Sequence, residues 1–576
     1  MPKRNKQSFL HGALILSFAA ILTKIIGALL FKIPLQNINM TAYGYFTLAF
    51  NIYVPIYTVS TAGFPIAVSR MVSHSLTLGR YRDIKIIHKV ANKVFLITGS
   101  VGTLLMILSA FIYPSFVKME NARLAMLVMA PSVLFCCLLT SYRGVYEGSR
   151  NMIPTAISQI VEAVGKLIFG ISLAAGALYL GQWQFSHGQV VYGIVAESSE
   201  QALEYSLPYI AAGGMFGVTA GSFFSFAYLV LFYRRNGSGI TRQELENAPK
   251  PKRPNVIFRS LLRFAIPVAL GTLATQLTTL IDAISFQKCL AIVIEKNGNI
   301  LREIYSQVIS AGKVNDLNGF LTGTRDAALT YVNLVPNITL SLGISALPVI
   351  TSAWALNDRV QLRRMVSNVL RITLLISLPS GIGLSVLAKP ILKMFYDPFV
   401  VQVAGPQLEV LGISVVFICL VAPINAMLQA MGRADVPAKI VLVGGAVKLF
   451  LNIVLVLNPR INVIGSAYST VACYTIMVIL SFVFLKRIMG MKLRWRSIFL
   501  KPLFATVCCS TAAWAVNGIL SRFVSNSISV LSAIAVAVFV YIWALLSIRA
   551  VKREDVLMLP KGQKIAQILE KYDWIG

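Results

Sequence analysis

Long apolar segments follow one another along the whole chain, separated by shorter polar stretches. A helical run of roughly 20 apolar residues is long enough to cross the hydrocarbon core of a bilayer. Because lipid offers the backbone no hydrogen-bond partner, each run is predicted to be helical. The pattern predicts about fourteen membrane spans and leaves no long soluble domain between them. The spans are 9–36, 44–70, 90–114, 122–142, 155–180, 209–233, 259–290, 326–354, 366–390, 406–430, 438–457, 462–485, 498–520 and 528–548.

The composition agrees with this pattern. Of the 576 residues, 56% are hydrophobic and 13% are charged, roughly half the charged fraction of a soluble domain. Water-soluble cores cannot hide so much apolar surface, so the chain is predicted to be an all-α polytopic membrane protein. The seven cysteines lie in or beside apolar runs without metal-ligand spacing, which is typical of small packing residues.

The net charge of +30 is distributed unevenly along the chain. Most of the 52 Lys and Arg residues fall between alternate spans, whereas segment 181–208 has none and carries Glu197, Glu200 and Glu204. Basic loops stay on the cytoplasmic side, so the asymmetry predicts that both termini are cytoplasmic. It also indicates contact with anionic phospholipids rather than with nucleic acid.

A weak internal repeat is spaced by 283 residues. AGFPIAV around Pro65 matches SALPVIT around Pro348, and Pro154 matches Pro437 in the same register. Six predicted spans separate equivalent points, so both copies cross the membrane in the same direction. Transporters with such parallel repeats bind substrate between the two halves and alternate access by rocking one half against the other.

The repeat predicts two six-helix lobes followed by two further spans. The predicted divisions are an N-lobe (1–234), a polar, proline-bearing cytoplasmic linker (235–258), a C-lobe (259–487), and spans thirteen and fourteen with a cytoplasmic tail (488–576). Glycine and proline interrupt some spans, for example at Gly63 and Pro65. Such residues indicate either tolerated kinks or bending as access alternates.

Charged residues inside spans cost about 2.5–3.5 kcal/mol each at the helix centre, so each needs an explanation. Lys24 lies within the first span, and Glu162 and Lys166 share one helical face of the fifth. Lys448 on the eleventh span is close to the repeat equivalent of Lys166. We interpret the three lysines as lining a cavity between the lobes, where they would attract phosphate.

Structural interpretations of the same residues remain open. Glu162 and Lys166 would neutralise each other as an ion pair, and Lys24 and Lys448 would snorkel toward the interface or bind helix carbonyls. Arg70 and Arg143 lie at span ends, where arginine commonly anchors a helix at the interface; they are also candidate substrate ligands.

Asp282, within TLIDAISF of the seventh span, is the clearest acidic candidate. A lone carboxylate in a span must be ion-bound, protonated or hydrogen-bonded. It is therefore a candidate site for a coupling cation, Na⁺ or H⁺, with a proton site or a structural hydrogen bond as alternatives.

Residues 143–162, RGVYEGSRNMIPTAISQIVE, resemble the RGxxQGxxxMxPTAxSQxxE signature of the polysaccharide-transporter family. That family includes the stage V sporulation protein B group and the MurJ-type lipid II flippases. LTKIIGALLFKIPL (22–35) and AGFPIAVSR (62–70) also resemble its first two helices, and the resemblance covers nearly the whole chain. One departure is Glu147, where the family usually has Gln.

The resemblance implies two six-helix lobes arranged in a V with two additional C-terminal helices, in a bacterial plasma membrane. It also implies transfer of an undecaprenyl-diphosphate-linked oligosaccharide, lipid II above all, to the outer leaflet, with wall-synthesis enzymes as possible partners. Some members hold sodium with residues that match Asp282 and Asn452. Val456 stands where those proteins have a second acidic ligand, so the sodium site is incomplete here.

Two other functions compete with the flippase. One is a cation-coupled multidrug exporter of the sister family, which the intramembrane lysines disfavour because cationic drugs call for acidic cavities. The other is a non-transporting scaffold for wall synthesis. The sequence has no nucleotide-binding or hydrolase motif and no metal motif, so neither catalysis nor a bound cofactor is expected.

Overall fold

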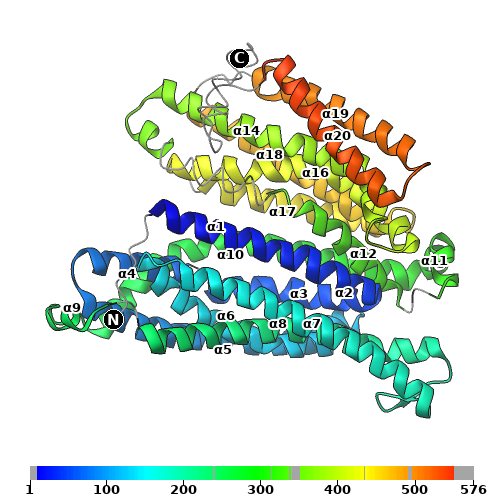
Figure 1. Ribbon diagram of the computed structural model, residues 1–576, viewed down its shortest axis with the longest axis horizontal. Coiled ribbons are helices and arrows are strands. Elements are labelled where there is room, and N and C mark those ends of the chain that lie inside the picture. The colour runs from blue at the N-terminus through cyan, green and yellow to red at the C-terminus, as the bar shows by residue number, and fades with distance from the viewer. Residues whose placement is uncertain are drawn as a thin grey trace. The chain divides into compact units, whose positions relative to one another are not determined.

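The computed structural model describes residues 9–61, 63–237, 240–312, 314, 316–336, 339, 350–433, 435–490 and 496–550. These residues divide into two compact units, Met1–Gly323 and Thr324–Gly576. Helices make up almost all of both units, apart from one short two-stranded sheet in the first (Figure 1). The predicted all-α polytopic fold is thus confirmed.

Most of the first unit consists of long helices that pack side by side (Figure 1). Its elements are α1 (Phe9–Ile25), the π-helix η1 (Ile26–Lys32), α2 (Ile33–Ile38), α3 (Met40–Thr61), α4 (Phe64–Thr77), α5 (Tyr81–Phe116), the 3₁₀-helix η2 (Glu120–Ala122), α6 (Arg123–Gly148), α7 (Ile153–Gly188), β1 (Val190–Val191), β2 (Ile194–Val195), α8 (Ser199–Asn236), α9 (Arg242–Glu246), α10 (Pro254–Ile304), α11 (Ser306–Ser310) and the start of α12 (Leu317–Val332).

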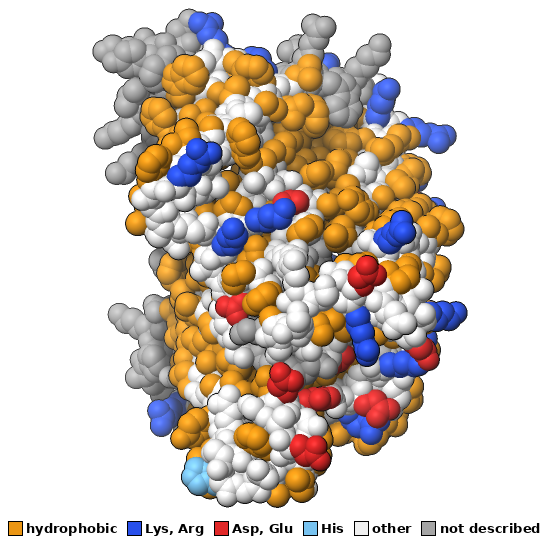
Figure 2. Space-filling model, turned by 90° about the vertical axis from the view of Figure 1, so that its right-hand side faces the viewer, with side chains coloured by type: hydrophobic (Ala, Val, Ile, Leu, Met, Phe, Trp, Pro, Cys, Tyr) orange, Lys and Arg blue, Asp and Glu red, His pale blue; other side chains and the backbone are white. Residues whose placement is uncertain are grey.

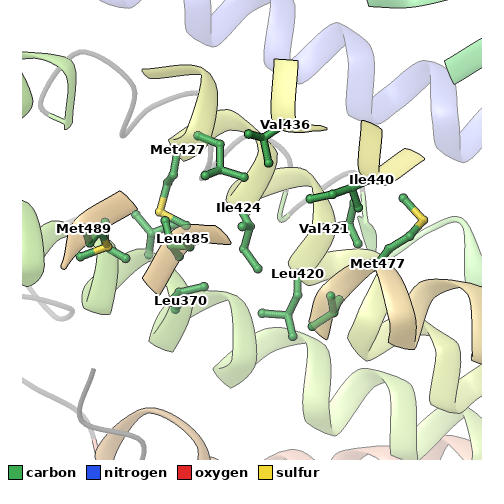
Figure 3. Close-up of a cluster of buried hydrophobic side chains, with 14 of the residues drawn as sticks. Leu370, Leu420, Val421, Ile424, Met427, Val436, Ile440, Met477, Leu485 and Met489 are labelled. Atoms are coloured by element: carbon green, nitrogen blue, oxygen red, sulfur yellow. The ribbon is translucent and has the colours of Figure 1, made fainter. Parts of the chain in front are cut away.

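The second unit contains the remainder of α12 and a further set of helices. These are α14 (Arg359–Val386), α15 (Ala388–Leu392), α16 (Pro398–Ala430), α17 (Asp435–Val456), α18 (Asn462–Met489), the π-helix η3 (Arg496–Leu500), α19 (Lys501–Leu520) and α20 (Asn526–Ser547). The core joins α14, α16, α17 and α18 through Leu370, Leu420, Ile424, Ile440 and Met477 (Figure 3).

Thirteen helical segments of the described chain are long and apolar enough to cross a membrane. Most of the predicted spans correspond to one segment each. The eighth predicted span, 326–354, includes residues 337–338 and 340–349, which lie outside the described residues, as does Pro348. Pro154 and Pro437, which the repeat aligns, both lie in the first turn of their helices, α7 and α17.

Local chemistry explains where several helices begin and break. The predicted span 44–70 is divided into α3 and α4 at Gly63, whose φ of 73° suits glycine, and Pro65 follows in the first turn of α4. Ser198 caps α8 by accepting a hydrogen bond from the Gln201 amide.

One segment differs from the sequence-based expectation. Segment 181–208 lies between two predicted spans, but α7 continues to Gly188, α8 begins at Ser199, and a short β-hairpin joins them. Segment 259–323 is part of the first compact unit, where α10 packs against α3, α4 and α5. The predicted lobe boundaries stay a prediction.

Candidate functional site

The position of the fifth-span charges is set by a close contact between α7 and α8. Gly165 and Gly170 on α7 face Gly221 and Gly217 on α8, and a Cβ added at Gly217 would lie 2.4 Å from the Gly170 Cα. Small residues let membrane helices approach closely and stabilise their packing. The backbone of α7 therefore lies against α8, and the side chains of the charged residues extend toward other helices.

Glu162 forms an ion pair with Arg143 of α6. The Arg143 Nη2 donates to Glu162 Oε2 over 2.8 Å, and its Nε donates to Ser158 Oγ over 2.9 Å. The same guanidinium donates to Ser225 Oγ of α8 over 3.3 Å. Arg143 thus belongs to a charged network that joins α6, α7 and α8.

Lys166 lies beside two aromatic rings. Its Nζ is 4.7 Å from the centroid of Phe31 in η1 and 5.2 Å from that of Phe50 in α3. Such contacts stabilise an ammonium group without neutralising its charge. Lys166 is half-buried, so this charge lies among the helices rather than on an exposed face.

Lys32 is a second cation at the same ring, with its Nζ 6.0 Å from the Phe50 centroid. Sequence reasoning missed it, although Lys32 follows Lys24 by eight residues and so comes from the same apolar run. Two ammonium groups that share one aromatic ring create a positive potential, which favours an anion nearby.

The other predicted residues of the first unit lie apart from this cluster or have different contacts. Lys24 on α1 is exposed, and the Arg70 guanidinium at α4 lies 4.3 Å from the Phe264 ring. Asp282 is half-buried on α10, where its backbone carbonyl accepts a hydrogen bond from Ser285. Their predicted roles stay predictions.

Two predicted residues belong to the second unit. Lys448 on α17 is half-buried, and Asn452 on the same helix is fully buried and accepts a 2.6 Å hydrogen bond from Ser469 Oγ. The structure therefore brings together Arg143, Glu162 and Lys166, while the proposed partnerships of Lys448 and Asn452 with residues of the first unit stay predictions.

Sequence reasoning also missed buried arginines in the second unit. Arg325 of α12 is buried and donates from Nε to Ser466 Oγ over 2.7 Å, and Arg371 of α14 is buried to 2% exposure. Arg325 directly precedes the predicted span 326–354, and Arg371 lies near the start of the predicted span 366–390. Neither therefore stands out in the sequence as a charge at the centre of a span.

Known membrane proteins resemble this chain in sequence and in fold. Residues 9–198 match the family model described as polysaccharide biosynthesis protein, and residues 327–538 match that of the lipid II flippase MurJ. The structure is similar to lipid II flippase MurJ in an inward closed conformation, with a TM-score of 0.60 and 16% identity over 92% of this chain and 98% of that one. An inward-facing multidrug MATE transporter gives the same TM-score at 13% identity, covering 84% of this chain and 99% of that one.

These matches define a multi-pass membrane transporter with the helical fold that MurJ and the multidrug MATE transporters share. Among relatives, stage V sporulation protein B of Bacillus subtilis (strain 168) is 23% identical over 96% of this chain and 98% of its own length. Lipid II flippase MurJ of the same organism is 23% identical over 84% of this chain and 83% of its own. The chain is thus similar to both proteins over most of its length.

Proposed function

We propose that this protein moves an undecaprenyl-diphosphate-linked oligosaccharide from the inner to the outer leaflet by alternating access, and that lipid II is its cargo. The observation that carries this proposal is the pair of lysines, Lys32 and Lys166, at the Phe50 ring. A diphosphate loses favourable hydration when it leaves water during its crossing. Cations in a low-dielectric site offset this loss of hydration free energy. The similarity to the lipid II flippase MurJ supports the class of cargo.

The Arg143–Glu162 pair supports the same assignment. Because Glu162 is neutralised by Arg143, its carboxylate opposes the positive potential at Lys166 less than an isolated carboxylate would. An exporter of cationic drugs would need the opposite arrangement, with acidic groups dominating. Coupling to Na⁺ or H⁺ through Asp282 remains part of the proposal, although Asn452 already accepts a hydrogen bond from Ser469 and Val456 is apolar and buried.

Depletion and re-expression test the proposal. In depleted cells, a lipid-linked precursor is expected to accumulate on the inner leaflet, and its structure identifies the cargo. Wild-type protein clears the precursor. Lys166→Ala should slow clearance by roughly tenfold or more, the equivalent of one lost charge-assisted hydrogen bond, at normal membrane levels. Lys166→Arg should restore part of the activity.

The control is Lys85→Ala, which removes an exposed lysine of α5 and should leave clearance unchanged. Full activity of Lys166→Ala would contradict the cationic site. If Lys166→Ala fails but Glu162→Ala with Lys166→Ala succeeds, the lysine serves only to balance charge. Drug resistance without precursor clearance would favour the exporter.

A further inference from the structure

A polar cavity of about 670 Å³ lies in the first unit at the end where α5 meets η2. Its lining has charged groups of both signs: Lys118 and Glu120 between α5 and α6, Glu204 of α8, and Arg302 of α10. Figure 2, which faces the end of the molecule that carries this region, shows Asp and Glu side chains gathered there among Lys and Arg side chains. The cavity is separate from the Lys166 cluster, with which it shares no lining residue.

The floor of the cavity is a fixed hydrogen-bond network. Tyr45 of α3 donates from its hydroxyl to Asp316 Oδ2 over 2.8 Å, and Asn121 Nδ2 donates to the same hydroxyl over 3.3 Å. Asp316 also accepts from the backbone amides of Asn318 and Gly319 at the start of α12. Burial raises the pKa of the Asp316 carboxyl, and these hydrogen bonds act against that shift.

Close backbone contact holds the floor rigid. A Cβ added at Gly44 would lie 1.9 Å from the Gly319 carbonyl oxygen, and one added at Gly323 would lie 2.4 Å from the Met40 carbonyl oxygen. The first two turns of α3 and of α12 are therefore in direct contact beside Tyr45 and Asp316. A rigid polar floor costs little further ordering when a ligand binds.

The mouth of the cavity has two charged side chains that can bind a ligand, Glu204 and Arg302. Lys118 pairs with Glu295, but among the described residues none forms an ion pair with Glu204 or Arg302. Both side chains are exposed. An unpaired carboxylate and an unpaired guanidinium at one cavity offer acceptors and donors to the same ligand.

Helices of the first unit are longer than a crossing of the hydrocarbon core requires. α7 has 36 residues and α8 has 38, about 54–57 Å at 1.5 Å per residue, against a core of about 30 Å. α10 has 51 residues and is kinked at Asn297, near the cavity. The predicted orientation places this end of the helices outside the cell.

We propose that this cavity binds a hydroxyl-rich saccharide, the glycan of the cargo after its crossing; the assignment rests on the proposed function. Sugar hydroxyls both donate and accept, so they suit a lining with carboxylates, a guanidinium, an amide and a phenol. A bare diphosphate is disfavoured by Glu120 and Glu204, and a bare cation by Lys118 and Arg302. The volume falls within the roughly 300–1,000 Å³ of sites for small ligands.

Binding of a soluble disaccharide, N,N′-diacetylchitobiose, to the purified full-length protein in lipid nanodiscs tests the proposal by calorimetry. Saturable binding is expected for the wild type. Glu204→Gln and Arg302→Gln should each weaken it by about tenfold. The matched control is Glu197→Gln, which replaces an exposed acid of the α7–α8 connection that does not line the cavity; it should bind like the wild type.

The outcomes separate this proposal from the proposed function. No saturable binding, or equal weakening by Glu197→Gln, overturns the saccharide site. If precursor clearance still depends on Lys166 in that case, the flippase function stands without it. If the disaccharide binds through Glu204 and Arg302 but depletion accumulates no lipid-linked precursor, the cavity takes free saccharide and the flippase assignment fails.

Discussion

At the residue scale, aromatic rings and an arginine stabilise the charged side chains among the helices. The ring of Phe50 lies near two ammonium groups, and the carboxylate of Glu162 lies 2.8 Å from the Arg143 guanidinium. Each of these charges thus has a stabilising neighbour, which lowers the cost of its insertion. The positive charge near Phe50 favours an anionic group in its neighbourhood.

Arg143→Ala should destabilise the protein by about 1–3 kcal/mol. Removing one partner of a buried pair costs more, about 3–5 kcal/mol, but Glu162 retains 34% side-chain exposure, so solvent recovers part of the loss. Thermal unfolding of purified protein in detergent measures the change. Glu162→Gln in the same chain should restore part of the stability.

The matched control for this prediction is Arg433→Ala. Its pair with Asp435 is exposed, with 50% and 45% side-chain exposure, and ion pairs at the surface contribute little to stability. Equal losses for the two alanine variants would contradict a structural role of the Arg143 network.

At the element scale, glycines determine how closely the helices approach. Gly217 against Gly170 lets α8 lie directly on α7, and this contact orients the face that carries Glu162 and Lys166. The same device joins the starts of α3 and α12 at Gly44 and Gly319. In both places a small side chain, rather than a large apolar one, creates the interface.

Gly217→Ala should cost about 1–3 kcal/mol, because the added methyl group forces α7 and α8 apart. Gly176→Ala is the matched control on α7, since a Cβ there meets nothing within 4 Å. Alanine favours a helix over glycine by up to about 1 kcal/mol, so the control should be neutral or stabilised. Thermal unfolding of both variants measures the difference, and equal melting temperatures would refute the contact.

At the scale of the whole molecule, the charge asymmetry and the helix lengths define two ends. Basic residues concentrate where α5 begins and where α9 and α10 begin, whereas the α7–α8 connection is acidic. The positive-inside rule then places the acidic end and its polar cavity outside.

Cysteine labelling tests this orientation. A membrane-impermeant maleimide should modify Glu197→Cys in intact cells, and Glu246→Cys only after permeabilisation. The native cysteines give little background because all are buried except Cys508, which is half-buried. Labelling of Glu246→Cys in intact cells would invert the predicted topology and place the cavity on the cytoplasmic side.

The sequence by itself determined that this is a helical multi-pass membrane protein. Long apolar runs leave the backbone no alternative to internal hydrogen bonds in lipid, so length and composition suffice. The sequence also identified Glu162 and Lys166 as residues needing an explanation, because a charge in a span is costly wherever it points.

Only the tertiary structure decided which groups meet. Arg143 and Glu162 are 19 residues apart, and Lys32 and Lys166 converge on one ring from different helices. The cavity with Tyr45 at its floor and Arg302 at its mouth combines segments far apart along the chain. Hydrophobic periodicity records which face of a helix avoids water, but it contains no information about which other helix covers that face.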